Sequence, residues 1–290
     1  MTIAAHPKVI GVLGLGSMGA GVAADLRKSG FKVVSALDGR SARTRERADA
    51  AGVEVLANLG DVVAAADTFL SIVPADQAEP LAEAVAQRLH GKPLHFVDCN
   101  SITPSKTLRI GIRLAAAGAV VSDGGIIGPP PGGRSKTKLF VSGPQSGILA
   151  SLQSDAMPVI QLGDSLSQAT EMKVLFSAAN KGAVALLANV LAAARSVGLQ
   201  DSVVSELDQR IPGLLGCVRN AAPELGDKAA RWAIEMDDLA AGLAEMGCHP
   251  GYHAAAGQNY RRLAGNLEGK AVTPDALGRV LDAWIVKTSH

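Results

Sequence analysis

The chain has 290 residues, of which 48% are hydrophobic and 19% are charged, a composition typical of a globular protein with one large domain or two. Its 28 Lys and Arg residues nearly balance its 27 Asp and Glu residues, and only 3% of the residues are aromatic. This balance excludes broad electrostatic capture of nucleic acid or of an anionic membrane, and the few aromatic side chains argue against a base-stacking surface.

The first half of the chain alternates between short apolar runs and helical patterns, as expected for strand–helix repeats. Strands are predicted at 8–13, 32–37, 53–56, 68–73, 94–97 and 119–122, and helices at 18–29, 41–51, 75–89 and 104–117. Repeats of this length predict an α/β fold, a doubly wound Rossmann domain with a parallel sheet and helices on both faces.

The strand–helix rhythm ends near residue 123. Residues 123–138 are predicted to form a loop because they contain a run of Gly and Pro, and late strands are predicted at 139–142 and 159–162. Residues 166–197 form a long Ala- and Leu-rich helical pattern, followed by shorter helices. We therefore predict an α/β domain over 1–164 and an all-helical domain over 165–290.

A Gly-rich turn follows the first predicted strand and opens a predicted helix. Its spacing is G-x-G-x-x-G, and a second strand follows at the distance expected of a Rossmann unit. The glycines permit a tight turn and close approach of a pyrophosphate, while the helix N-terminus presents N–H groups to the phosphates. The residues predicted to bind a dinucleotide here are Gly14, Leu15, Gly16, Ser17, Met18 and Gly19.

The end of the second strand should recognise the adenosine ribose of that dinucleotide. Asp38 lies about 20 residues after the Gly-rich turn, near the place of an acidic residue that binds the 2′-hydroxyl of NAD. Arg40 and Ser41 follow at once, with Arg43 and Arg45 beyond them, and this group suits the 2′-phosphate of NADP. NADP is therefore favoured, and NAD remains an alternative.

Polar residues form a stripe on the long apolar helical pattern. Lys173, Ser177 and Asn180 are spaced i, i+4 and i+7, so their side chains share one face that either meets water or lines a wet cleft. An enzyme that oxidises an alcohol with a nicotinamide cofactor needs a base for the hydroxyl proton, and burial shifts the pKa of a lysine toward that task. Lys173 is therefore the candidate acid/base.

The motifs and their order along the chain resemble those of the β-hydroxyacid dehydrogenases, a family that includes the 3-hydroxyisobutyrate and 6-phosphogluconate dehydrogenases. The resemblance rests on the Gly-rich turn, on 98–104, on 123–128 and on a helical lysine after the boundary. It implies hydride transfer between a nicotinamide and a small, anionic hydroxy or keto acid, with Lys173 as general acid/base.

The resemblance also implies further site residues. Asn100 and Ser101 match the polar pair near the nicotinamide and the substrate, and Val73 and Pro74 match the segment that lines the nicotinamide. The helical domain would bind substrate and form a homodimer, which would also bury the flank of the long helix.

The family's substrate-binding motif is altered in this chain. DAPVSGG is expected where the sequence reads Asp123-Gly124-Gly125-Ile126-Ile127-Gly128, so Ile127 replaces the usual Ser, and Ser177 replaces the usual Asn four residues after the Lys. Residues 128–131 and 231–236 instead resemble a poorly characterised branch with a helical domain of unknown function. The substrate-binding candidates are Gly125, Ile127, Gly128, Ser177, Glu235 and His253.

Two other functions remain open. Imine reductases share this architecture but usually lack the lysine, and a dinucleotide-binding protein without catalysis would explain the altered substrate motif. Hydrolase and kinase motifs are absent from the sequence, since it contains neither GxSxG nor GxxxxGK[ST].

Metal binding and secretion are not expected. His249 and His253 follow Cys248 closely, but Pro250-Gly251 interrupts any helix between them and no distant Cys or His pair completes a set of four ligands. The three cysteines are an odd number, widely spaced and without a Cys-x-x-Cys pair. We expect reduced thiols, no secretory leader and a cytoplasmic location.

Overall fold

The computed structural model describes residues 7–133, 136–267 and 275–285. The chain divides into two compact units, Met1–Lys173 and Val174–His290. The predicted boundary at 164 follows the change in secondary structure, since the last strand ends at Gly163, whereas the compact units divide inside the long helix that follows.

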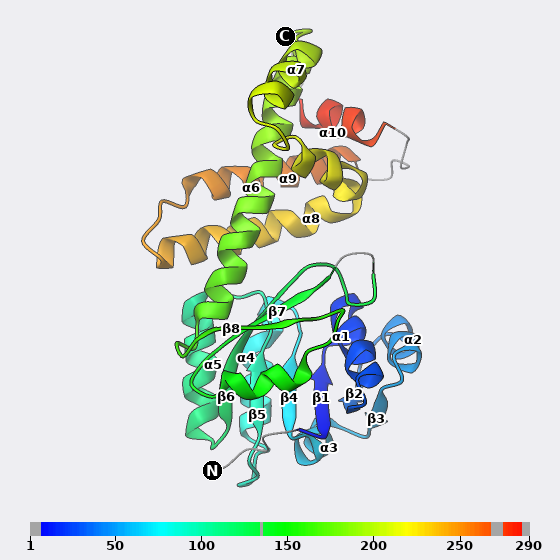
Figure 1. Ribbon diagram of the computed structural model, residues 1–290, viewed down its shortest axis with the longest axis vertical. Coiled ribbons are helices and arrows are strands. Elements are labelled where there is room, and N and C mark those ends of the chain that lie inside the picture. Colours follow the sequence, from blue (N-terminus) through cyan, green and yellow to red (C-terminus); the bar gives the residue numbers. More distant parts are fainter. Residues whose placement is uncertain (1–6, 134–135, 268–274, 286–290) are drawn as a thin grey trace. The chain divides into compact units, whose positions relative to one another are not determined.

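Eight strands of the first unit form one sheet (Figure 1). They are β1 (Val9–Leu13), β2 (Lys32–Ala36), β3 (Glu54–Leu56), β4 (Thr68–Ser71), β5 (His95–Asp98), β6 (Val120–Ile127), β7 (Lys138–Ser142) and β8 (Val159–Gly163), in the order β3-β2-β1-β4-β5-β6-β7-β8. Neighbouring strands are parallel except β6 and β7, which are antiparallel. The predicted Rossmann-like sheet is confirmed: the strands of the strand–helix repeats are parallel, and the antiparallel pairing enters with the late strand β7.

Helices cover both faces of this sheet, as predicted for a doubly wound fold. They are α1 (Ser17–Lys28), α2 (Ala42–Ala50), α3 (Leu59–Ala65), η1 (Ala75–Gln77), α4 (Ala78–Ala86), α5 (Pro104–Ala116) and η2 (Ser146–Leu152). Residues of α1, α2 and η2 pack in one core cluster, and residues of α3, α4 and α5 pack in a second. The central strands β4 and β5 are buried along their whole length, which explains why they read as short continuous runs.

The loop predicted at 123–138 is wrong in its first part. Asp123–Ile127 continues β6 and pairs with Lys138–Ser142 of β7. Gly124 and Gly125 read as turn residues, but both are buried in the strand, where neighbouring groups come close: a Cβ on Gly124 would lie 2.7 Å from Cys99 Sγ. The strand ends at Ile127, before Gly128, whose φ is +125°.

The second unit is helical throughout its described residues. It holds most of α6 (Gln168–Ser196) together with α7 (Gln200–Arg210), α8 (Gly216–Glu245), α9 (Gly251–Leu267) and α10 (Ala276–Trp284). Three aromatic residues meet edge to face in its core, with the ring centroids of Trp232 and Tyr260 5.5 Å apart and those of Tyr260 and Trp284 5.6 Å apart.

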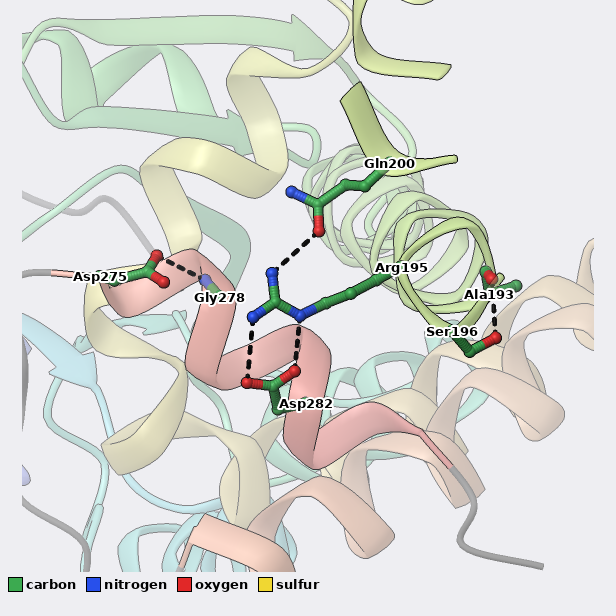
Figure 2. Close-up of polar contacts among 7 residues, drawn as sticks. All are labelled: Ala193, Arg195, Ser196, Gln200, Asp275, Gly278 and Asp282. Carbon is green, nitrogen blue, oxygen red and sulfur yellow. Dashed lines mark hydrogen bonds and ion pairs between the residues drawn. The ribbon is translucent and has the colours of Figure 1, made fainter. Parts of the chain in front are cut away.

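Polar contacts attach α10 to the end of α6 (Figure 2). Arg195 holds both carboxylate oxygens of Asp282, at 2.5 and 3.2 Å, and its Nη1 donates to Gln200 Oε1 at 3.0 Å. Asp275 accepts a hydrogen bond from the backbone N–H of Gly278 at 2.8 Å and so caps α10.

Helix α6 is the one described helix that is long and apolar enough to cross a bilayer on length and composition alone. Core helices of soluble proteins pass the same test, and 44% of the most apolar window of α6 is buried inside the protein. This feature is therefore weak evidence for a membrane span.

Candidate active site

The Gly-rich turn joins β1 to α1 in the geometry that a dinucleotide requires. A Cβ on Gly14, whose φ is +94°, would collide with the carbonyl of Ile72, and a Cβ on Gly19 would collide with the carbonyl of Gly14. By contrast, no described atom lies within 4 Å of a Cβ on Gly16, which is exposed. Space is therefore kept open at the one glycine of the turn where a phosphate must approach.

The N-terminus of α1 can receive that phosphate. Gly16 is its N-cap, and a side-chain hydrogen bond from this cap is absent among the described residues, which suits an anionic ligand at the N–H groups of the first turn. Ser17 is exposed and Met18 is half-buried. The Leu15 side chain is part of the core, so Leu15 could contact a ligand only through its backbone. The residues present fit a dinucleotide pyrophosphate.

The structure brings the predicted ribose-binding residues together after β2. Asp38, Arg40 and Ser41 are all exposed around a turn at Gly39, whose φ is +67°. Arg45 folds back to this turn, where its Nη2 donates to the carbonyl of Leu37 at 3.1 Å. An acidic and a basic side chain thus stand at the same turn, and this arrangement is compatible with both cofactors.

A row of four buried polar residues crosses the sheet where β4 and β5 end. Ser71 pairs with Asp98, Asp98 with Asp123, and Asp123 with Ser142 in the register of adjacent strands. Each is at most 2% exposed. Register partners project from the same face of a sheet, so one polar line lies at the carboxyl ends of the strands, where ligands bind in folds of this kind.

Asn100 connects this row to the predicted nicotinamide segment. Its Oδ1 accepts from the backbone N–H of Val73 at 2.7 Å, its Nδ2 donates to Ser71 Oγ at 2.9 Å, and its own N–H donates to Asp98 Oδ1 at 2.8 Å. Asn100 is 2% exposed, whereas Ser101 is exposed. The predicted polar pair is therefore divided: Asn100 fixes the segment Val73-Pro74, and Ser101 faces outward.

The Lys173 amine lies at the same strand ends. Its Nζ donates to the carbonyl of Cys99 at 3.3 Å, and Cys99 directly precedes Asn100. The side chain is half-buried. The amine therefore lies next to the residue that precedes Asn100, and its role as acid/base stays a prediction.

Two carboxyl groups of the polar row interact with the charge of Lys173. Burial raises the pKa of Asp98 to about 6 and that of Asp123 to about 7, although hydrogen bonds from Asn100 and Thr170 and the charge of Lys173 oppose these shifts. Asp98 Oδ2 is buried without a hydrogen-bond partner among the described residues. Groups that titrate near neutral pH at strand ends are a common property of active sites.

The substrate-binding candidates of the first unit differ in their surroundings. Gly125 is buried, and a Cβ there would lie 2.5 Å from the carbonyl oxygen of Ala169, so this glycine serves the packing of α6. Ile127 is half-buried and Gly128 exposed. The loop beyond them packs on α1, since a Cβ on Gly21 would meet Pro130 at 2.9 Å, a contact that sequence reasoning missed.

One candidate of the second unit, Glu235, belongs to an ion pair that sequence reasoning also missed. Glu235 binds Lys181 at 2.9 Å, and the Lys181 amine lies 5.8 Å from the Trp232 ring centroid. His253 Nε2 lies 3.3 Å from the carbonyl of Ala178. Ser177 is half-buried in α6. Among the described residues, groups of three His, Cys, Asp or Glu side chains able to hold a metal do not occur.

Comparison with known families gives matches to two separate parts of the chain. Residues 9–154 match the NAD binding domain of 6-phosphogluconate dehydrogenase, and residues 194–263 match a domain of unknown function, DUF1932. A 3-hydroxyisobutyrate dehydrogenase of Pseudomonas aeruginosa is 31% identical over 158 residues, which are 52% of this chain and 50% of that protein. The match thus spans about half the length of that relative.

Solved structures share the fold over nearly the whole chain. A conserved hypothetical protein of Sinorhizobium meliloti is 21% identical, with a TM-score of 0.73 and coverage of 95% of this chain and 96% of that one. The 3-hydroxyisobutyrate dehydrogenase of Mycobacterium tuberculosis, studied with L-serine, is 18% identical, with a TM-score of 0.74 and coverage of 94% and 98%. At this identity, the likeness shows a common fold.

Proposed function

Because the chain belongs to the family of the NAD binding domain of 6-phosphogluconate dehydrogenase, we propose that it is an NAD(P)-dependent oxidoreductase of the β-hydroxyacid dehydrogenase type. The bound nicotinamide would supply or accept the hydride. Lys173 takes the hydroxyl proton of the substrate during oxidation and returns it to the carbonyl oxygen during reduction. The hydride and the proton together account for the two hydrogen atoms exchanged.

The observation that carries this proposal is the contact between Lys173 Nζ and the carbonyl of Cys99, at 3.3 Å. Cys99 precedes Asn100, and Asn100 holds Val73 at the start of the segment expected to line the nicotinamide. A proton-transferring amine and the expected cofactor segment thus share one set of strand ends. Holding both groups in place before the reaction lowers the entropic cost of the transition state.

The substrate is proposed to be a small, anionic hydroxy or keto acid. The family resemblance supports this class. Ile127 and the packed Gly125 replace residues of the usual substrate motif, so the identity of the acid should differ from 3-hydroxyisobutyrate. NADP is the favoured cofactor because Arg40 and Ser41 are exposed at the ribose turn.

A turnover screen tests the proposal. Hydroxy acids, keto acids and imines are offered to the wild-type protein with NADPH, NADH and their oxidised forms, and Lys173→Ala is measured beside it. We expect turnover of an acid, a loss of about 10²–10⁴ in kcat in Lys173→Ala, and nearly unchanged NADPH affinity. Turnover of imines alone would identify an imine reductase, and cofactor binding without any turnover would identify a non-catalytic binding protein. Unchanged kcat in Lys173→Ala would remove the lysine from the mechanism.

We also propose a homodimer formed through the helical unit. Several large apolar side chains of α6 and its C-terminal turn are exposed in the single chain, among them Leu175, Phe176, Leu186, Val190 and Val197. Such a surface favours association with a second copy. Sedimentation equilibrium at micromolar concentration should give a dimer, and a monomer would contradict the proposal.

A further inference from the structure

The first turn of α6 is held by side chains of the sheet. Ala169 and Thr170 are its second and third residues, so their N–H groups precede the first i→i−4 bond of the helix, which runs from Glu171 N to Ser167 O. Ser142 Oγ accepts from Ala169 N at 3.0 Å, and Asp123 Oδ2 accepts from Thr170 N at 2.6 Å. A helix cap is thus supplied by residues that lie far from α6 in the sequence.

Both carboxylate oxygens of Asp123 accept hydrogen bonds from this turn. Oδ1 accepts from the hydroxyl of Thr170 at 2.7 Å, and that hydroxyl lies 3.0 Å from the hydroxyl of Thr107 in α5. Asp123 and Ser142 are register partners of β6 and β7, so the two caps come from one cross-strand pair. The first turn of α6 is therefore fixed in both position and rotation relative to the sheet.

Lys173 depends on this attachment. It lies four residues after Ala169 and three after Thr170, so its side chain is on the same helix face as the capped residues. Gly125 lets the helix approach, since a Cβ on Gly125 would lie 2.5 Å from Ala169 O and 3.5 Å from Lys173 Cβ. Any displacement of the first turn would therefore move the amine away from the carbonyl of Cys99.

We propose that Asp123 is the positioning residue for Lys173: it caps α6 from within the sheet and sets the place and the electrostatic surroundings of the amine. This inference rests on the proposed function of Lys173 but reaches residues that the proposed chemistry does not use. Asp123 acts in two ways: through the hydrogen bonds to Thr170 and, once ionised, through its charge, which interacts with the charge of Lys173.

Three variants separate the cap from the charge, and a fourth serves as the control. Asp123→Asn keeps an oxygen that can accept from Thr170 N but removes the charge, whereas Asp123→Ala removes both. Ser142→Ala removes the cap on Ala169 and leaves the charge in place. Asn58→Ala is the matched control, because Asn58 Oδ1 caps α3 in the same unit by accepting from Asp61 N at 3.1 Å and lies outside the site.

Two measurements report on these variants without cofactor or substrate. Hydrogen exchange at the Ala169 and Thr170 amides reports on the cap. Labelling of Lys173 by N-hydroxysuccinimide acetate reports on the amine, and its rate is measured at a series of pH values by peptide mass spectrometry. We expect Thr170 to exchange at least about tenfold faster in Asp123→Ala and Ala169 to do so in Ser142→Ala. In Asp123→Asn the labelling midpoint should move to lower pH, because the ammonium loses a neighbouring negative charge.

Equal labelling profiles for Lys173 in Asp123→Asn, Asp123→Ala and Asn58→Ala would overturn the proposal, even with faster exchange, because Asp123 would then be a cap without effect on the lysine. If Asp123→Ala does not fold, Asp123→Asn and Ser142→Ala decide the question alone. The proposed function can fail separately from this inference. If the wild-type protein shows no turnover, or if Lys173→Ala stays active, the proposed function is refuted, while hydrogen exchange and Lys173 labelling can still be measured.

If the wild-type protein does turn over a substrate, Asp123→Ala should lower kcat at least about tenfold and leave the Kd for NADPH within about twofold.

Discussion

Asn100 Oδ1 and the backbone N–H of Val73 form a buried hydrogen bond of 2.7 Å that ties the end of β5 to the end of β4. The segment Val73-Pro74 begins at that bond. The side chain of Asn100 is therefore part of the scaffold beneath the expected nicotinamide position.

Replacing Asn100 should loosen that scaffold. Asn100→Ala leaves the Val73 N–H and the Ser71 hydroxyl without their partner, and we expect a loss of about 1–3 kcal/mol in the free energy of unfolding together with weaker NADPH binding. Ser101→Ala is the control, since Ser101 is exposed and should change stability by less than about 0.5 kcal/mol. Chemical denaturation measures the free energy of unfolding, and a cofactor titration measures NADPH binding. Equal effects of Asn100→Ala and Ser101→Ala would contradict the role of Asn100 in the scaffold.

The glycines of the turn should separate folding from cofactor binding. Gly16→Ala places a methyl group where no described atom lies within 4 Å, so we expect stability within about 1 kcal/mol of wild type but an NADPH Kd at least about tenfold higher. Gly19→Ala drives a methyl group into the carbonyl of Gly14 and should cost about 1–3 kcal/mol even without cofactor. Thermal unfolding and titration of both variants give the comparison, and a Gly16→Ala protein that binds NADPH normally would refute the proposed phosphate position.

Arg40 should decide between the two cofactors. Arg40→Ala removes a guanidinium group that is exposed at the ribose turn, and the loss of charge-assisted hydrogen bonds to a 2′-phosphate should raise the NADPH Kd about 10- to 100-fold. The NADH Kd should stay within about twofold, which makes NADH the internal control. If both affinities fall equally or neither changes, Arg40 does not read the 2′-phosphate.

Stability should depend on pH through Asp123. Its pKa is raised by burial from 3.8 to about 7, so the folded chain binds this proton more tightly than the unfolded chain does. The stabilisation is complete below about pH 4 and is lost as pH rises through about 7. Asp123→Asn should therefore gain stability relative to wild type across this window, by at most ~1.4 kcal/mol per pH unit. Asp155→Asn provides the control, because Asp155 is exposed. If the difference in free energy of unfolding between Asp123→Asn and wild type does not change with pH, the raised pKa of Asp123 is contradicted.

Local signals made the first part of the fold predictable. The role of Gly19 depends on Gly14 in the same strand–turn–helix unit, so the G-x-G-x-x-G spacing is visible in the sequence. The contact of Gly14 with the carbonyl of Ile72, by contrast, depends on the pairing of β1 with β4. The extension of β6 was missed because Gly124 and Gly125 read as turn residues until the close approach of Cys99 and α6 is known.

Partners from distant segments could not be predicted. The contact of Asn100 with Val73 depends on the alignment of β4 with β5, and the contact of Asp123 with Thr170 depends on where α6 returns to the sheet. The Lys181–Glu235 ion pair likewise requires the packing of α8 beside α6. None of these pairs has a characteristic spacing in the sequence, so the pattern of one sequence does not predict them.

We propose that the Lys173 amine lies beside the bound nicotinamide, and protection of that amine from chemical labelling by bound cofactor provides the test. Labelling of Lys173 by N-hydroxysuccinimide acetate is measured for the free protein, with saturating NADP⁺, and with saturating 2′,5′-ADP, which keeps the adenosine and 2′-phosphate but lacks the nicotinamide. We expect NADP⁺ to slow labelling by at least about tenfold and 2′,5′-ADP to leave it nearly unchanged, because only the nicotinamide end should reach the strand ends that hold Lys173. Labelling that stays at the free rate with NADP⁺ bound would show that Lys173 lies away from the nicotinamide.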